Sequence, residues 1–332
     1  MWPLAIAFFL SLLVACGLTP VLAKYARGIG LTRVDCHKAE PRPQVPLLGG
    51  VSILVAAFSG LAVEFLLYPQ YRFEIAVHAA AVLMAFVVGI VDDLFILGGP
   101  TKTALTALPL LPIVLGWGLF EGRIVLGKPL VPILGSLRIT IIYWLLLPLA
   151  IAGPANVVNM LDIMNGIMPG TMLIAFASLL SSAVLLNIEK GIILTVPWIG
   201  ALCGYLPYNS YPASIFNGDA GSLTVGASLA SIAVLTRMEF MALVALLPHL
   251  LNGFLVVSSV GFKEHRKHKE RPIEVAPDGS LKPNLSPSAP MSLTRLLLAS
   301  AGTMRENEVV ICYILGEFVA AILTIVSALL VK

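Results

Sequence analysis

The sequence predicts an all-α polytopic membrane protein with about ten transmembrane helices, and two observations support this fold class. Hydrophobic residues make up 58% of the 332 residues and charged residues only 12%, which is far from the composition of soluble globular proteins. Several apolar stretches also reach the roughly 20 residues that a helix needs to cross a hydrocarbon core about 30 Å thick. We therefore expect a single integral membrane domain over residues 1–332.

The first apolar run, residues 2–26, has no basic residue before it, whereas Lys24 and Arg27 stand at its end. It is therefore expected to be a retained span with its N-terminus outside. Residues 121–139 alternate branched apolar residues with Gly and Pro, which favours a short β-hairpin on the outer face. The four cysteines form no CxxC pair and predict neither a disulfide framework nor a zinc site. The other nine helices are expected at 48–68, 73–92, 102–120, 139–158, 168–187, 190–208, 221–236, 239–262 and 308–331.

The loops on one side of the membrane carry nearly all the unusual polar residues. Together with their flanking residues they hold 14 of the 21 Lys and Arg residues, so the positive-inside rule makes this side the cytoplasmic face. We therefore predict one cytoplasmic site, with residues 263–307 as a basic cytoplasmic loop. Counted from an outside N-terminus, the loops on this side are 28–47, 93–101, 159–167, 209–220 and 263–307.

Asp92 and Asp93 stand side by side at the end of the third helix, in "GIVDDLFILGGPTK". The helix dipole presents negative charge there and the two carboxylates repel each other, so a cation or a basic partner is required. Lys102, at the start of the next helix, could reach back toward them. A solvated loop start for the aspartates and a snorkelling anchor for Lys102 are the simpler alternatives.

The segment "NVVNMLDIMNGIMPG" places Asn156, Asn159, Asp162 and Asn165 three residues apart, so on a helix they share one face. Such an oxygen-rich stripe at a helix end suits Mg²⁺, which takes few protein ligands and is completed by water and substrate phosphates. Hydrogen bonds between helices are the alternative explanation for the asparagines.

Two further segments have the chemistry of anion or metal binding. Asp219 lies in a Gly-flanked turn in "FNGDAGSL", and the helix beginning at Ser222 would offer free backbone N–H groups to a phosphate. A purely structural N-cap is the alternative for Asp219. The loop "GFKEHRKHKERP" is a dense basic cluster, which suits either a phosphate-rich substrate or anionic lipid head groups. Its candidate residues are Arg266, Lys267, His268 and Lys269.

In this order and spacing, these segments resemble the polyprenyl-phosphate N-acetylhexosamine-1-phosphate transferases over nearly the whole chain. The matching stretches are "VDCHKAEPRPQVPLLGG", "VDDLFILGGPTK", "NVVNMLDIMNGI", "FNGDAGSL" and "PHLLNGFLVVSSVGFKEHRKHKERP". The loop "KHKERP" and the tail "LTRLLLASAGTMRENEVV" look like the eukaryotic and archaeal branch that uses UDP-N-acetylglucosamine and dolichyl phosphate. The multi-histidine run of the bacterial cell-wall branch is absent, and the short final insertion points to an archaeal member.

The resemblance implies transfer of N-acetylglucosamine-1-phosphate from UDP-N-acetylglucosamine to a polyprenyl (dolichyl) phosphate, with release of UMP. This would be a first membrane step of lipid-linked glycan assembly such as protein N-glycosylation. By family analogy Asn159 and Asp219 would hold Mg²⁺, with Mn²⁺ as a substitute, and Asp92 and Asp93 would lie near the acceptor. Lys102 and His268 are the further catalytic candidates. The candidates for substrate binding are Asn156, Asp162, Asn165, Arg266, Lys267 and Lys269.

Two of these positions depart from the family pattern. Bacterial members usually have an aspartate where this chain has Asn165, and the eukaryotic pattern lacks a carboxylate where this chain has Asp162. The central motif therefore lies between the branches, and the resemblance leaves open which of these residues touches the metal.

The expected partners are a UDP-sugar nucleotide and a polyprenyl phosphate lipid, with no nucleic acid, and relatives suggest a homodimer. The plasma membrane of a prokaryote is favoured over the endoplasmic reticulum. Another UDP-N-acetylhexosamine, or undecaprenyl phosphate for cell-wall synthesis, is the alternative within the family, and a covalent aspartyl route is an alternative mechanism. A transporter is the competing class, but its polar groups are expected near the bilayer midplane and on both faces.

Overall fold

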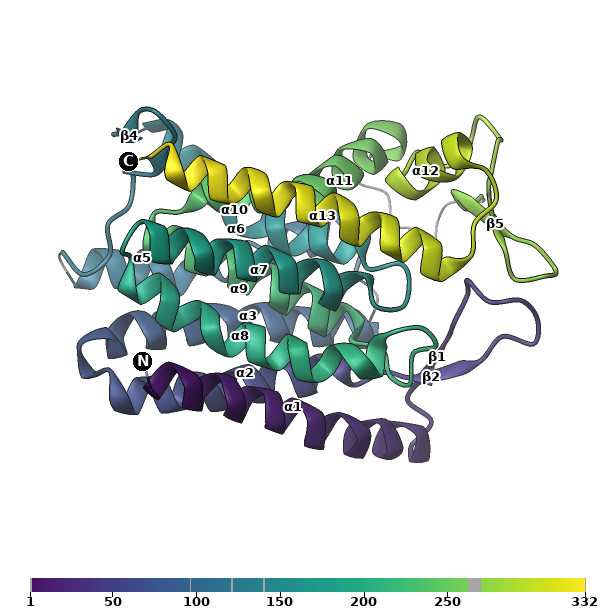
Figure 1. The fold of residues 1–332 in the computed structure, drawn as a ribbon, viewed down its shortest axis with the longest axis horizontal. Coiled ribbons are helices and arrows are strands. Elements are labelled where there is room, and N and C mark those ends of the chain that lie inside the picture. Colours follow the sequence, from purple (N-terminus) through teal and green to yellow (C-terminus); the bar gives the residue numbers. More distant parts are fainter. Residues whose placement is uncertain (1, 96, 121, 140, 262–269, 332) are drawn as a thin grey trace.

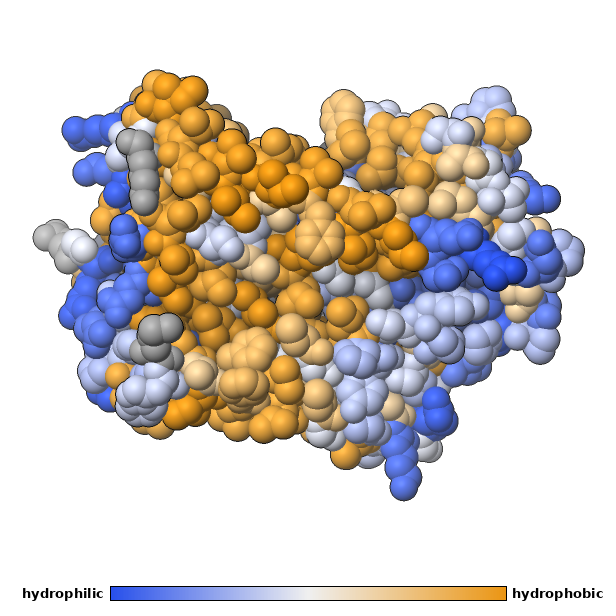
Figure 2. All heavy atoms as spheres, in the orientation of Figure 1, coloured by the Kyte–Doolittle hydropathy of each residue, from blue (hydrophilic) through white to orange (hydrophobic). Residues whose placement is uncertain are grey.

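A computed structural model of the chain confirms the predicted fold class. It describes all residues except 1, 96, 121, 140, 262–269 and 332. Within the described residues, nine helices are long and apolar enough to cross a membrane, and a bent helix pair makes a tenth if it counts as one span. Figure 2 shows a hydrophobic band across the visible face between two hydrophilic ends. The chain is an integral, multi-pass membrane protein.

The spans follow the predicted order, with ends shifted by a few residues. Both termini and the hairpin strand β4 lie at one end of the molecule in Figure 1, whereas β1, β2, β5 and α12 lie at the other end, called here the site end. The unbroken spans are α1 (Trp2–Gly28), α2 (Gly49–Leu67), α3 (Arg72–Phe95, preceded by the 3₁₀ turn η1, Pro69–Tyr71), α6 (Ile141–Leu161), α7 (Ile167–Leu185), α8 (Glu189–Asn209), α9 (Gly218–Thr236) and α13 (Glu306–Leu329).

The span predicted at 102–120 is present as Gly99–Leu119, although a short turn divides it, whereas the prediction of one straight helix at 239–262 was wrong. The first divides into α4 (Gly99–Leu105) and α5 (Leu110–Leu119), with Pro109 just before α5. The second divides into α10 (Glu239–Ala245) and α11 (Leu247–Val260), which are bent by 72°. Pro248 stands in the first turn of α11. Proline lacks an N–H and clashes with the preceding turn of a helix. It is therefore tolerated in the first turn but kinks or breaks a helix when it stands further inside.

Three short antiparallel hairpins and one short helix complete the described fold. The pairs are β1 (Thr32–Val34) with β2 (Gln44–Pro46), β3 (Leu130–Val131) with β4 (Gly135–Ser136), and β5 (Ile273–Val275) with β6 (Leu281–Pro283). The second pair confirms the hairpin predicted within residues 121–139. The helix α12 (Leu293–Ala301) precedes α13.

The small residues of α9 allow α3 and α6 to pack closely against it. A Cβ added at Gly226 of α9 would lie 2.6 Å from the carbonyl oxygen of Pro154 on α6. A Cβ added at Gly89 of α3 would lie 2.4 Å from the Cα of Ala220 on α9. Because both distances are well inside van der Waals contact, only glycine fits, and the polar ends of all three helices meet at the site end.

Candidate active site

A cavity of about 1740 Å³ opens at the site end and gathers most of the predicted site residues. Its lining comes from α3, α4, α6, α8, α9, α11 and α12, from β1 and β5, and from loops between them. The predicted residues that line it are Asp92, Lys102, Asn156, Asn159, Asp162, Asn165 and Asp219. Segments far apart in the sequence therefore form one site.

Lys102 is the centre of the polar contacts in this cavity. Its Nζ lies 2.6 Å from Oδ2 of Asp92 and 3.1 Å from Oδ1 of Asp219. The same nitrogen donates to Oδ1 of Asn159 at 2.7 Å. The prediction that Lys102 reaches back to the aspartate pair is confirmed for Asp92. Because one ammonium joins α3, α4, α6 and α9, these four helices fix one charged cluster.

Asp93 is not among the residues that line the cavity; it lies against the first turn of α9. Its carboxylate accepts the backbone N–H groups of Asp219 at 3.0 Å and Ala220 at 2.9 Å. A carboxylate at a helix N-terminus is stabilised by these free N–H groups and by the helix dipole. The helix begins at Gly218 rather than near Ser222, so the expectation of free N–H groups for a phosphate was wrong there: Asp93 already takes two of them.

The predicted polar stripe does not continue along one helix face, because α6 ends at Leu161. Asn156 and Asn159 lie on α6, whereas Asp162 and Asn165 lie in the loop that leads to Gly166, whose φ is +84°. Their partners also differ. Asn156 donates to Oγ1 of Thr106 at 2.6 Å, and Asn165 donates to Oδ2 of Asp35 at 3.1 Å. Of the four, only Asn159 contacts Lys102 and Asp219.

Asp162 is the titratable group whose ionisation the site perturbs most clearly outside the membrane-spanning segments. Burial raises the pKa of its carboxyl to about 7. The side chain of Asn217, which donates to Oδ2 of Asp162 at 2.6 Å, acts in the opposite direction. The negative charges of Asp219 and Asp93 raise the pKa further. A cation or a ligand donor arriving at the cavity would therefore favour the ionised form.

Arg33 and Arg42 of the first loop line the cavity, and Lys38 contacts the lining residue Asp35; the sequence did not single out any of the three. Arg33 on β1 lies 3.0 Å from Oδ1 of Asp93. Lys38 pairs with Asp35 at 3.2 Å and with Glu306, whose other oxygen accepts the backbone N–H of Asn165 at 2.9 Å. Lys38 lies within the first-loop stretch that resembles the family, whereas Arg33 stands one residue before that stretch. The network ties this loop to the start of α13 and to the loop after α6.

The donor set around Asp219 is oxygen-based but poor in carboxylates. Within the part of the chain that the structure describes, no three His, Cys, Asp or Glu side chains are placed to hold a metal ion. Oxygens of Asn159 and Asp219 nevertheless converge on one cation, the ammonium of Lys102. Few protein oxygens next to open cavity space fit a cation such as Mg²⁺, which keeps several waters and takes substrate phosphates. The predicted residues Arg266, Lys267, His268 and Lys269 lie outside the described residues.

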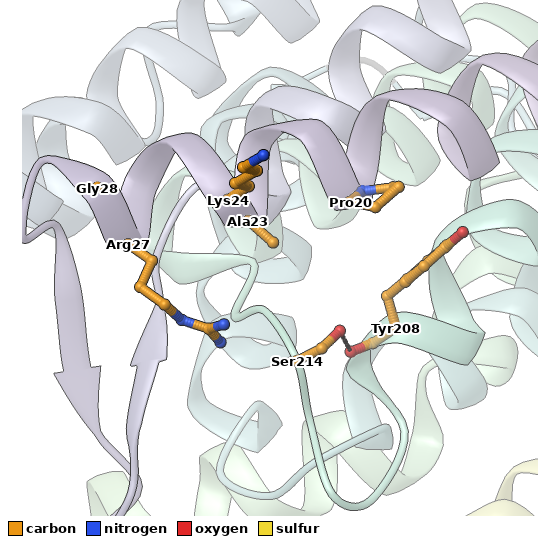
Figure 3. Close-up of a pocket in the computed structure, with 7 residues that line it drawn as sticks. All are labelled: Pro20, Ala23, Lys24, Arg27, Gly28, Tyr208 and Ser214. Atoms are coloured by element: carbon orange, nitrogen blue, oxygen red, sulfur yellow. Dashed lines mark hydrogen bonds between the residues drawn. The ribbon is translucent and has the colours of Figure 1, made fainter.

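A second, smaller cavity of about 570 Å³ contains none of the predicted site residues. It lies beside the last turns of α1, where Figure 3 shows Arg27 and Ser214 on opposite sides of it. Its lining residues are Pro20, Ala23, Lys24, Arg27, Gly28, Tyr208 and Ser214. Neither the predicted carboxylates nor the predicted amides reach it, so the larger cavity is the candidate active site.

Known proteins with similar sequences carry the names of transferases. Residues 75–237 match the profile of glycosyl transferase family 4. A provisionally named glycosyltransferase of Methanocaldococcus jannaschii is 27% identical over 322 residues, which cover 97% of this chain and 95% of that protein.

Two other relatives carry more specific names. A protein of Saccharolobus solfataricus, provisionally named UDP-N-acetylglucosamine–dolichyl-phosphate N-acetylglucosaminephosphotransferase, is 27% identical and covers 98% of this chain and 95% of its own length. The phospho-N-acetylmuramoyl-pentapeptide-transferase of Shouchella clausii is 27% identical, over 73% of this chain and 78% of its own length. Both names fall among the transferases that the motifs resemble. The chain is therefore a multi-pass membrane protein that resembles glycosyl transferase family 4 over residues 75–237 and is similar to these transferases over most of its length.

Proposed function

We propose that the protein transfers N-acetylglucosamine-1-phosphate from UDP-N-acetylglucosamine to a polyprenyl phosphate of the dolichyl type and releases UMP. One observation carries the proposal: Lys102 joins Asp92, Asn159 and Asp219 in a cavity whose other part is apolar and follows α6 and α11. A polar half suits a nucleotide pyrophosphate, and an apolar half suits a lipid. The name of the Saccharolobus relative, which spans nearly the whole chain, supports the same donor and acceptor.

The polar half supplies the groups that phosphoryl transfer needs most, which are positioning and charge neutralisation. Lys102 would bind the donor pyrophosphate, since its ammonium is already at the centre of the cluster. Asn159 and Asp219 would hold Mg²⁺. When bound there, this ion would neutralise the pyrophosphate and stabilise the departing UMP. The basic residues Arg266 to Lys269 would add contacts to phosphate oxygens.

The reaction is proposed as a single in-line displacement. An oxygen of the lipid phosphate attacks the β-phosphorus of the UDP-sugar, and the bond from that phosphorus to the bridging oxygen breaks, so UMP leaves with the bonding electrons. A phosphate monoester with a second pKa near 6 is mostly dianionic at pH 7, so the attack needs no strong base. Asp93 fits a positioning role, because both of its oxygens already accept N–H groups of α9.

Asp92 has a different role in this proposal. Its Oδ1 accepts the backbone N–H of Leu97 at 2.7 Å, while its Oδ2 contacts Lys102. It would orient the ammonium toward the donor, at the edge of the space that the acceptor phosphate would enter. Asn156, Asp162 and Asn165 line the same cavity and would contact the sugar or the nucleotide.

The apolar half of the cavity would hold the first isoprene units of the acceptor. The bend between α10 and α11 turns α11 away from the bundle axis, and the cavity continues along that helix. Small and branched apolar residues on the two helices line this part: Leu149, Ala152, Gly153, Val157, Gly253, Val256, Val257 and Val260. A lipid acceptor could thus approach from the bilayer while the water-soluble nucleotide enters from the site end.

A donor and acceptor panel tests the proposal. The purified protein would receive UDP-N-acetylglucosamine, another UDP-N-acetylhexosamine or UDP-N-acetylmuramoyl-pentapeptide, each with dolichyl or undecaprenyl phosphate, and lipid products would be identified by mass spectrometry. Polyprenyl-pyrophosphate-N-acetylglucosamine as the dominant product supports it. If only another UDP-sugar is turned over, the proposed phosphosugar transfer stands and the proposed donor is replaced by that UDP-sugar. If no pair gives a lipid product, the transferase proposal is contradicted and a transporter is favoured. A phospho-enzyme isolated without acceptor would replace the single displacement by the covalent route.

A further inference from the structure

The guanidinium of Arg33 is a second positive group beside Asp219, and it lies near the carboxylate oxygen that Lys102 does not contact. Its Nη1 lies 3.9 Å from Oδ2 of Asp219, whereas Lys102 contacts Oδ1 of the same carboxylate at 3.1 Å. Its Nη2 contacts both Oδ1 and the backbone carbonyl of Asp93, at 3.0 and 3.2 Å. The Asp219 carboxylate therefore has one positive group beside each oxygen.

The backbone of Arg33 is anchored while its side chain reaches the cavity. Arg33 is paired with Val45 in the β1–β2 hairpin, and its side chain is 31% exposed and lines the cavity. A guanidinium remains charged at any pH at which the protein is folded. Arg33 is thus a permanent, ligand-accessible positive charge next to the carboxylate that is proposed to hold the divalent cation.

The charges of the cluster show what this arrangement does. Asp92, Asp93 and Asp219 contribute three negative charges, and Lys102 and Arg33 contribute two positive ones. A divalent cation next to Asp219 is attracted by the carboxylates but repelled by both basic groups. A pyrophosphate is attracted by the basic groups and repelled by the carboxylates. Each ligand therefore removes the repulsion that the other one meets.

We propose that Arg33 is a positioning residue that couples divalent-cation binding to nucleotide binding: its charge holds Asp93 and Asp219 in place and weakens binding of the cation until a pyrophosphate neutralises the guanidinium. The inference rests on the proposed function, because it takes Asn159 and Asp219 as the cation site. It assigns to Arg33 a role that none of the motif residues fills.

The test measures Mn²⁺ binding, without turnover, from the electron paramagnetic resonance signal of free Mn²⁺. Arg33→Gln should bind Mn²⁺ about three- to tenfold more tightly than the wild type, because one repelling charge is removed at close range. The same variant should bind UDP without metal more weakly by a similar factor. Arg33→Lys, which keeps the charge, should remain close to the wild type in Mn²⁺ affinity. Arg27→Gln, at the exposed end of α1, is the matched control and should change neither.

Each other outcome has a defined meaning. If Arg33 only holds Asp93 in position, Arg33→Gln and Arg33→Lys would both bind Mn²⁺ with the wild-type affinity or more weakly. Either result for Arg33→Gln would overturn the inference. Asp219→Asn separates this failure from that of the proposed function. Weaker Mn²⁺ binding by Asp219→Asn with an unchanged Arg33→Gln would remove only the inference. Unchanged Mn²⁺ binding by Asp219→Asn would remove the cation site itself.

Discussion

Lys102 is the single side chain on which the candidate site depends most. It contacts Asp92, Asn159 and Asp219. Its removal would leave the buried carboxylate of Asp92 without an ion pair. It would also remove the ammonium that is proposed to bind the donor pyrophosphate. We expect Lys102→Gln to lower kcat/KM by about 100-fold or more, the range seen when a preorganised charge is lost. UMP release under saturating and subsaturating donor would measure it.

Lys24→Gln is the matched control for that variant. Lys24 is an exposed lysine on α1 that lines the smaller cavity and contacts none of the site residues. It should leave turnover unchanged. Wild-type turnover by Lys102→Gln would contradict the central place of Lys102.

Asp162 gives a prediction about pH and stability. Its pKa is about 7 in the folded protein against an ordinary value of 3.8, so the folded state keeps the proton more firmly than the unfolded state. The stability that this provides is complete below about pH 4 and is lost as the pH rises to about 7. The melting temperature of Asp162→Asn in detergent, relative to the wild type, should therefore rise between pH 5 and pH 7 and stay constant above pH 7. A pH-independent difference would contradict the raised pKa.

The individual residues show which parts of the site a sequence can predict. The pairing of Lys102 with Asp92 followed from two like charges at a helix end, which need a cation nearby. The shared stripe of Asn156 to Asn165 was wrong because α6 ends at Leu161, close to the predicted helix end at 158, so Asp162 and Asn165 lie beyond the helix. Arg33 was missed because a basic residue in a loop is ordinary until the fold places it next to Asp93.

At the level of elements, α9 holds the site together by close helix packing. Gly89→Ala would bring a Cβ to 2.4 Å from the Cα of Ala220, so α3 must move relative to α9, and Asp93 sits one turn further along α3. We expect a lower melting temperature and at least a tenfold loss of activity, since small displacements of catalytic groups are costly. Gly316→Ala on α13, where nothing lies within 4 Å of the new Cβ, should behave like the wild type. Equal behaviour of both variants would contradict the packing argument.

The apolar groove between α6 and α11 gives a second prediction at this scale. Val257→Trp should narrow the groove and raise the KM for polyprenyl phosphate about fivefold or more, with little change in the KM for the UDP-sugar. Leu251→Trp, on the exposed side of the same helix and outside the cavity lining, is the control. The two KM values would come from acceptor and donor titrations. An equal rise in both would mean that α11 does not form a separate lipid subsite.

Element order was predictable because hydrophobic length alone defines a membrane span. The breaks at Pro109 and Pro248 were not predicted as breaks, although proline is a strong signal. Length and hydropathy continue across both prolines, yet the chain turns by 72° only between α10 and α11. The hairpin within residues 121–139 was predictable from its Gly and Pro residues.

For the whole molecule, span parity and charge asymmetry agree with the structure on one point: the polar motifs gather at a single end. Figure 1 places both chain ends and β4 away from that end. The cytoplasmic orientation of the site end stays a prediction from the positive-inside rule. A cavity that is polar at one end of the bundle and apolar along α11 is the feature that separates a lipid-modifying enzyme from a transporter.

The measurement that tests the account most directly is UMP release by the purified protein with UDP-N-acetylglucosamine, polyprenyl phosphate and Mg²⁺, with each component omitted in turn. Asp219→Asn would be measured beside the wild type and checked for an unchanged elution profile in detergent. Release of UMP should require all three components and should be lost in Asp219→Asn. Release by Asp219→Asn at the wild-type rate, or no release by the wild type with any component set, would contradict it.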